Sequence, residues 1–149
     1  MKMVLFSMLF IGSFLFMEFW AWFSHKYIMH GFLWVLHKDH HIRDGRKLER
    51  NDWFAVMFGL PSVWLIMHGL NRDNFFTLAI GLGIALYGLA YFLFHDLYVH
   101  QRIRIPKIEN RYLRATLKAH EEHHQKGKSK NFGFLIAPLK YYKEEFSKK

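Results

Sequence analysis

The sequence predicts an all-α integral membrane protein: a helical bundle of three or four transmembrane helices with a cytoplasmic, histidine-rich helical cap. Three observations lead to this fold class. Apolar residues gather in three long blocks, although the mean hydropathy of the whole chain is only -0.04. Basic residues gather in the segments between and after these blocks, and so do almost all of the histidines. At 149 residues the chain has the length of one domain, so we treat residues 1–149 as a single membrane-embedded unit.

The apolar blocks span residues 3–24, 53–70 and 75–94. A helix rises about 1.5 Å per residue, so roughly 20 residues cross the hydrocarbon core of a bilayer. A cleavable signal peptide is the alternative for the first block, but the apolar run is long and no small-residue cleavage site follows it. A buried hairpin is the alternative for the other two. A soluble domain of this size would struggle to bury three such blocks, so we expect membrane spans.

The basic residues set the expected orientation. Only Lys2 and Arg72 fall on one side of a three-span arrangement, whereas all other Lys and Arg residues lie in 25–52 and 95–149. Cytoplasmic loops carry the Lys/Arg excess, so both segments are expected to face the cytoplasm, at the inner membrane of a bacterium. This rule and anionic lipid headgroups account for the net charge of +9. Nucleic-acid binding is not expected, because no binding motif accompanies the charge.

The histidines form the same pair of boxes twice. An HxxxxH box is followed by an HxxHH box in each cytoplasmic segment, and an odd number of spans brings all four boxes to one membrane face. Together they hold ten of the eleven histidines: His25, His30, His37, His40, His41, His95, His100, His120, His123 and His124. In an HxxHH box the three rings share a helix face. In an HxxxxH box the two rings point about 140° apart on an ideal α-helix. Either the helix end unwinds so that both rings reach one site, or each ring approaches a different metal.

This pattern predicts metal binding. The chain has no Cys, which leaves histidine and carboxylate as the strong ligands. Ten imidazoles exceed the four ligands of a structural zinc site and suit two ions with open positions, for which non-haem iron is the usual choice in oxygen chemistry. A pH-sensing cluster is the alternative, but it does not need the repeated spacing.

Four acids and one histidine complete the candidate residues. Metal-bound imidazoles need their second nitrogen held, and the acids within the boxes could do this, or could equally be solvated charges: Asp39, Asp96, Glu121 and Glu122. His68 lies outside every box and is expected to be a packing residue. Glu18, an acid inside a span, is a functional candidate that could instead bond to a neighbouring helix.

The residues around the boxes resemble one family. The pieces AWFSHKYIMHG, WVLHKDHH, YGLAYFLFHDLYVHQR, AHEEHH and NFGFLIAPL, with ND at 51 and 52, resemble the membrane-bound β-carotene hydroxylases of the fatty acid hydroxylase and sterol desaturase superfamily. The resemblance covers about residues 18–139. It implies a di-iron domain with the ten box histidines as ligands, O2 as co-substrate, a carotenoid substrate dissolved in the lipid bilayer, and a ferredoxin-type electron donor. The implied reaction is hydroxylation of β-carotene at C3 of its β-ionone rings, through β-cryptoxanthin to zeaxanthin.

Other functions remain open at the level of sequence. The same metal core could serve a fatty acid or sterol hydroxylase, a desaturase or a carotenoid ketolase. A non-catalytic membrane protein that binds or transports metal is a third class. Transport would require polar groups at the membrane midplane, and the block 75–94 offers none. Within the spans, Gly81, Gly83 and Gly88 are expected to permit close helix packing, with or without a slot for the substrate.

Overall fold

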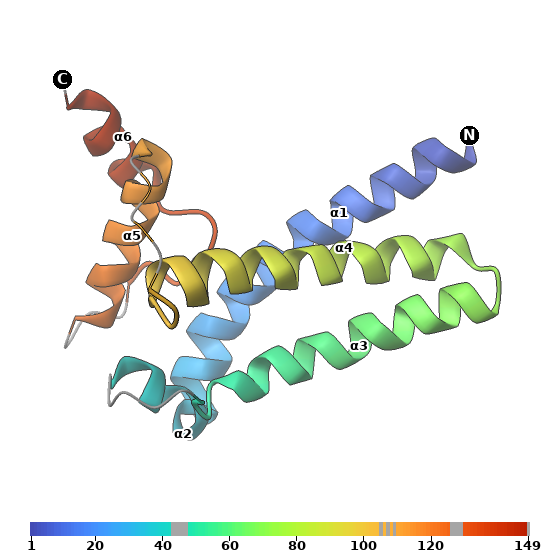
Figure 1. Ribbon diagram of the computed structural model, residues 1–149, viewed down its shortest axis with the longest axis horizontal. Helices are drawn as coiled ribbons and strands as arrows, with labels where there is room; N and C mark the ends of the chain where they lie inside the picture. Colours follow the sequence, from blue (N-terminus) through green and yellow to red (C-terminus); the bar gives the residue numbers. More distant parts are fainter. Residues whose placement is uncertain (43–47, 105, 107, 109, 126–129, 149) are drawn as a thin grey trace.

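The computed structural model describes residues 1–42, 48–104, 106, 108, 110–125 and 130–148. The described residues are helical or irregular, with no strand among them. Figure 1 shows two long antiparallel helices, α3 (Asp52–Asn71) and α4 (Phe75–Tyr91), crossed by α1 (Lys2–Phe23). The shorter helices gather at one end of this bundle. The predicted all-α fold with a His-rich region is therefore confirmed.

The three predicted spans are present, and each is longer than its apolar block. Within the described part of the chain, the helices that could cross a membrane run over Lys2–Phe32, Asp52–Asn71 and Phe75–Val99. Only 6%, 17% and 22% of their most apolar stretches is buried inside the protein. The exposed remainder is hydrophobic and would need lipid to cover it, as expected for an integral membrane protein.

Glycines and small polar residues set the packing between these helices. Gly81 faces Leu65 and Ile66 of α3, and Gly83 faces Phe10 and Ser13 of α1, each at a distance that leaves no room for a Cβ. Ser62 on α3 donates a hydrogen bond of 2.8 Å to the carbonyl of Gly81. Close approach of helix backbones at small residues is the usual way in which membrane helices associate. The packing role expected for Gly81 and Gly83 is confirmed.

Two π-helical segments extend the spans into the cap. In η1 (Ser24–Phe32) and η3 (Phe92–Val99), which continue α1 and α4, backbone amides bond to carbonyls five residues back. The amide of Leu33 donates to Ile28 at 3.0 Å, and that of His100 donates to His95 at 2.9 Å. After η1 the chain turns through α2 (Trp34–His37) and the 3₁₀ turn η2 (Lys38–His41).

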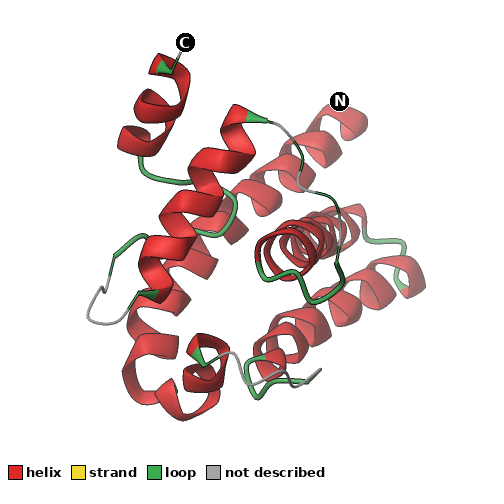
Figure 2. Cartoon of the chain, turned by 60° about the vertical axis from the view of Figure 1, so that its left-hand side comes forward, coloured by secondary structure: helices red, strands yellow, loops and turns green. Residues whose placement is uncertain are grey.

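The last two helices form a pair beside this end of the bundle, as Figure 2 shows. Helix α5 (Arg111–His124) is capped by Asn110, whose side chain accepts hydrogen bonds from the amides of Tyr112 and Leu113. Its alanines pack against Tyr141 of α6 (Leu139–Ser147), which is fully buried. Arg114 bonds to Glu145 at 3.2 Å across the pair. This packing fixes the polar face of α5, and with it the last His box, toward the other three boxes.

Candidate metal centre

The two HxxxxH boxes lie on the two π-helical segments. A helix whose amides bond to the fifth residue back is wider than an α-helix, so residues five apart lie closer to the same face than they would on an α-helix. The rings of His25 and His30 accordingly have centroids 5.1 Å apart, and those of His95 and His100 are 4.6 Å apart. The expectation of an unwound helix end is thus replaced by a wider helix, which brings both rings of each box to the same place.

Five imidazoles form what we call the first centre: His25, His30, His37, His41 and His123. One nitrogen from each lies within 4.8 Å of all the others. The Nε2 atom of His37 is 3.1 Å from that of His25 and 3.2 Å from that of His41. The Nε2 atoms of His30 and His123 are also 3.1 Å apart. Five ring nitrogens therefore converge on one point.

The second centre contains the other five: His40, His95, His100, His120 and His124. The first four present nitrogens within 4.8 Å of one another. The Nε2 atoms of His100 and His120 are 2.8 Å apart. His124 joins them through ring contacts, with centroids 4.5 Å from His120 and 4.8 Å from His100. The two centres adjoin, since the rings of His41 and His124 stack at 4.3 Å.

Each HxxHH box supplies both centres. The outer residues His37 and His41 serve the first centre, whereas the middle residue His40 serves the second. In the other box the outer pair is in the second centre, and the middle residue, His123, is in the first. On an α-helix the third and fourth residues after a given position point about 100° apart, so neighbouring histidines face different centres. The shared face predicted from the spacing is therefore split between two sites.

The outer nitrogens of the rings are held by oxygen atoms. In the first centre, Nδ1 of His25 donates to the carbonyl of Phe132 at 2.9 Å and Nδ1 of His37 donates to Oδ1 of Asn51 at 2.7 Å. Nδ1 of His123 donates to the carbonyl of Lys130 at 2.6 Å. Because these oxygens only accept, Nδ1 carries the hydrogen and Nε2 keeps a lone pair that faces the centre. This arrangement fixes the tautomer that binds a metal through Nε2.

Carboxylates hold two rings of the second centre. Nδ1 of His40 donates to Oε2 of Glu49 at 2.9 Å, and Nδ1 of His95 donates to Oδ1 of Asp96 at 2.8 Å. The expected contact of Asp96 with a box histidine is confirmed. The Nε2 atoms of His40, His95 and His124 are buried and have no hydrogen-bond partner among the described residues. A buried nitrogen of this kind is costly unless something binds it, and a metal ion would satisfy all three.

The other three acids make different contacts. Asp39 accepts a hydrogen bond of 2.7 Å from the backbone amide of Arg50, and Glu122 accepts one of 2.8 Å from the hydroxyl of Tyr141. Glu121 is exposed. The residues that do hold ring nitrogens and that the box spacing did not reveal are Glu49, Asn51 and the carbonyls of Phe132 and Lys130. A signal for two of them was present, because Asn51 belongs to the ND pair and Phe132 to the piece NFGFLIAPL, both singled out above.

Burial keeps the cap imidazoles neutral. It lowers the pKa of His37 to about 3, of His41 to about 4 and of His124 to about 2, and neighbouring histidines lower the pKa of each further. It also holds the pKa of His40 and His120 well below the usual value. Neutral imidazole is the form that ligates a metal. Bonds of about 2.1 Å to one ion place adjacent ligand atoms about 3 Å apart, which agrees with the Nε2 separations above.

His68 is remote from both centres. It lies near the end of α3 that joins α4, and its Nδ1 is 3.5 Å from the hydroxyl of Thr77. Its ring packs against Trp64 with centroids 5.4 Å apart. The expected packing role of His68 is confirmed.

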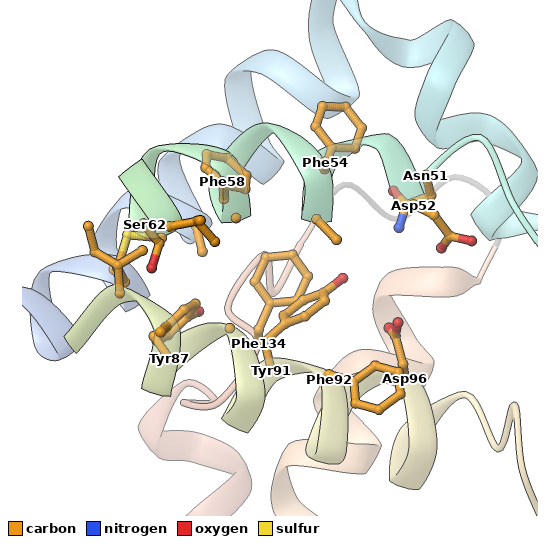
Figure 3. A pocket seen from close by; sticks show the side chains of 18 of the residues that line it. Asn51, Asp52, Phe54, Phe58, Ser62, Tyr87, Tyr91, Phe92, Asp96 and Phe134 are labelled. Atoms are coloured by element: carbon orange, nitrogen blue, oxygen red, sulfur yellow. The ribbon is translucent and has the colours of Figure 1, made fainter. Parts of the chain in front are cut away.

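An apolar cavity of about 290 Å³ lies between α1, α3 and α4, beside the centres. Figure 3 shows Phe54, Phe58 and Tyr87 along it, with Asn51 and Asp96 at one end. Gly88 and Phe92 also line this cavity, so the spans do enclose an apolar slot, the possibility that the sequence left open.

Two aromatic rings separate this cavity from the histidines. Tyr91 stacks on His95 with centroids 4.6 Å apart, and Phe134 stacks on His25 at 4.6 Å. The two rings meet at 4.9 Å. One wall of the cavity therefore contacts both centres.

Known proteins are similar to this chain over most of its length. Residues 10–140 match the model of the fatty acid hydroxylase family. A beta-carotene hydroxylase of Pantoea ananas is 42% identical over 127 residues, which are 82% of this chain and 71% of that protein. A beta-carotene hydroxylase of Pseudescherichia vulneris is 41% identical over 135 residues, 88% of this chain and 76% of that protein.

A plant relative is longer. The chloroplastic beta-carotene 3-hydroxylase 2 of Arabidopsis thaliana is 37% identical over 133 residues, which are 86% of this chain. The match covers 44% of that protein, so the chain spans less than half the length of its plant relatives. No solved structure matches the chain.

Proposed function

The chain belongs to the fatty acid hydroxylase family, and on this premise we propose that it hydroxylates the β-ionone rings of β-carotene at C3. Reaction at one ring gives β-cryptoxanthin, and reaction at both gives zeaxanthin. The observation that carries the proposal is the gathering of ten imidazoles in two adjoining centres, nine through converging ring nitrogens and His124 through ring contacts, next to an apolar cavity between membrane-capable helices. The bacterial relatives named beta-carotene hydroxylase support the choice of substrate.

We propose that each centre holds one iron ion. Five imidazoles would bind each ion through Nε2 and leave room for a further ligand. Two bound irons would supply the reduction of O2 that places one oxygen atom in a C–H bond and releases the other as water. The chain's own part is to fix the ring tautomers through Nδ1 and to keep bulk water from the buried nitrogens.

The cavity suits one end of the substrate. Its volume of about 290 Å³ is near the lower limit of small-molecule pockets, about 300 Å³, so it fits a single ring rather than a whole carotenoid. The polyene would remain among the spans and the lipid. Tyr91 and Phe134 would then orient the ring, because their side chains stand between the cavity and the two centres.

We propose that the centres face the cytoplasm at a bacterial inner membrane. The Lys/Arg asymmetry of the sequence supports this orientation. A ferredoxin-type protein would supply the two electrons. The net charge of +9 favours an acidic donor, since complementary charge speeds encounter.

The test is pigment analysis in a bacterial host that accumulates β-carotene, supplied with iron. The wild-type chain should yield pigments heavier by one and by two oxygen atoms, hydroxylated at C3. His123→Ala removes a ligand of the first centre and should lower product at least about 100-fold. His68→Ala is the matched control and should leave product near the wild-type level.

Two results would contradict the proposal. Unchanged β-carotene, with the protein in the membrane and loaded with iron, would exclude this substrate. Products with a ring carbonyl, and no hydroxylated product, would indicate a ketolase instead.

A further inference from the structure

Arg102 lies at the meeting point of three carboxylates close to the second centre. Its Nη2 donates to Oδ1 of Asp52 at 2.6 Å and to Oε2 of Glu49 at 3.2 Å. Its Nη1 is 3.9 Å from Oδ2 of Asp96. The side chain is only 21% exposed. A planar guanidinium can donate in several directions at once, so it can hold the three acids in fixed positions.

The backbone conformation at Gln101 and two hydrogen bonds after η3 position Arg102. Gln101 has φ 52, in the left-handed region, and it reverses the backbone at the end of η3. Its side-chain amide donates to the carbonyl of Tyr98 at 2.7 Å. The backbone amide of Arg102 then donates to the carbonyl of Asp96 at 3.2 Å. The guanidinium is thereby directed back toward the start of α3.

Two of the three carboxylates also hold metal-facing histidines. Oε2 of Glu49 accepts from both Arg102 and Nδ1 of His40. Asp96 uses Oδ1 for Nδ1 of His95 and presents Oδ2 to Arg102. His40 and His95 come from different boxes, and both belong to the second centre. A single guanidinium therefore links the supports of two ligands that are 55 residues apart in sequence (95 − 40).

In the part of the chain that the structure describes, no carboxylate holds a ring nitrogen of the first centre. The acceptors for His25, His37 and His123 are two backbone carbonyls and the side-chain amide of Asn51, all neutral. A carboxylate partner raises the basicity of a ligating imidazole more than a neutral oxygen does, and loss of such a partner costs about 10–100-fold in metal affinity. The two centres therefore differ in the charge that supports their ligands.

We propose that Arg102 is a positioning residue for the second centre alone, where it holds Glu49 and Asp96 as anionic partners of His40 and His95. The second centre is then the tighter of the two and fills first. This inference rests on the proposed metal-binding function. It adds a difference in metal affinity between the two centres. The His boxes alone do not predict this difference, because both halves of the sequence carry the same spacing.

The experiment is an anaerobic titration of metal-free, detergent-solubilised protein with Co²⁺, followed by its visible absorption and by metal analysis. The wild-type chain should bind two equivalents in two steps whose affinities differ by about 10–100-fold. Arg102→Gln should weaken the tighter step by about that factor and leave the weaker step in place. Arg104→Gln is the matched control, because Arg104 is exposed and only two residues away.

A variant that binds metal more tightly cannot be explained by misfolding, so a second test uses a substitution that should raise metal affinity. Asn51→Asp gives His37 an anionic partner, so it should tighten the weaker step and bring the two affinities together. Glu49→Gln keeps an acceptor oxygen for His40 but removes its charge, so it should weaken only the tighter step.

Three outcomes would overturn the proposal. Two equal steps in the wild-type protein would remove the inequality. An effect of Arg102→Gln on both steps alike, or on neither, would remove the specific role of Arg102. No metal binding by the wild-type protein would overturn the proposed function as well, which separates that failure from the other two.

Discussion

Glu18 is a carboxylate within a membrane span, and its contacts explain why the chain tolerates it there. Its Oε1 accepts from the backbone amides of Phe134 and Ile136 at 3.2 and 3.0 Å, and both of its oxygens lie within reach of the amide of Leu135. Oε2 also accepts from the hydroxyl of Tyr87 at 2.8 Å. The sequence left two roles open for Glu18, and its contacts support the second, a hydrogen bond to a neighbouring helix, here Tyr87 of α4. Glu18 also accepts hydrogen bonds from the loop that contains Phe134 and Ile136. The acid fastens the loop whose Phe134 stacks on His25.

We expect Glu18→Leu to destabilise the protein by about 3 kcal/mol, since hydrogen bonds to a charged group contribute about 1.5–3 kcal/mol each and are not additive. Bound metal should fall as well, because Phe134 would no longer be held against the first centre. The measurement is the thermal midpoint in detergent together with metal content. Phe16→Leu, on the exposed face of α1, is the control. An unchanged midpoint in Glu18→Leu would show that the loop is held by other contacts.

At the scale of elements, two glycines of the same helix have different roles. A Cβ on Gly83 would collide with Ser13 and the backbone of α1, whereas a Cβ on Gly88 would meet no heavy atom within 4 Å. Gly88 lines the cavity, and Gly83 does not. The first glycine therefore serves helix packing, and the second keeps space open beside the centres.

This difference predicts opposite results for one substitution. Gly83→Leu should separate α4 from α1, at a cost of about 1–3 kcal/mol or more, and lower the thermal midpoint. Gly88→Leu should keep the midpoint and the metal content but remove most of the hydroxylated pigment, because its side chain fills the proposed ring site. Full activity of Gly88→Leu would place the substrate elsewhere.

At the scale of the whole molecule, three spans bring both His-rich segments to the same end. Helices α2 and α5 lie at the same end of the α3–α4 hairpin in Figure 1, while the turn between α3 and α4 lies at the far end. The Lys/Arg distribution predicts that this far turn faces away from the cytoplasm.

The absence of native Cys makes that orientation testable with single cysteines. A maleimide that cannot cross the membrane should label Arg72→Cys in intact spheroplasts, but should label Ser147→Cys only after the membrane is opened. Both positions are exposed. The reverse pattern would place the centres outside the cytoplasm and contradict the proposed access to a cytoplasmic electron donor.

The spans, the helical class and the ten histidines that gather could all be predicted from the amino-acid sequence alone. These follow from local properties, namely the length of an apolar run, the placement of Lys and Arg, and the repeated boxes. The contact of Asp96 with a ring could also be anticipated, because Asp96 adjoins His95 in the chain.

The fold was needed to assign each histidine to a centre and to identify the group that holds its outer nitrogen. His40 and His41 are neighbours in sequence but face different centres. The angle between their side chains can be predicted from local helix geometry. The rings that each one meets depend on how α5 and η3 pack against them. His25 is likewise held by the carbonyl of Phe132, 107 residues away. The spacing of the boxes predicts that the rings converge, but the division of the ten rings between two sites follows from the fold.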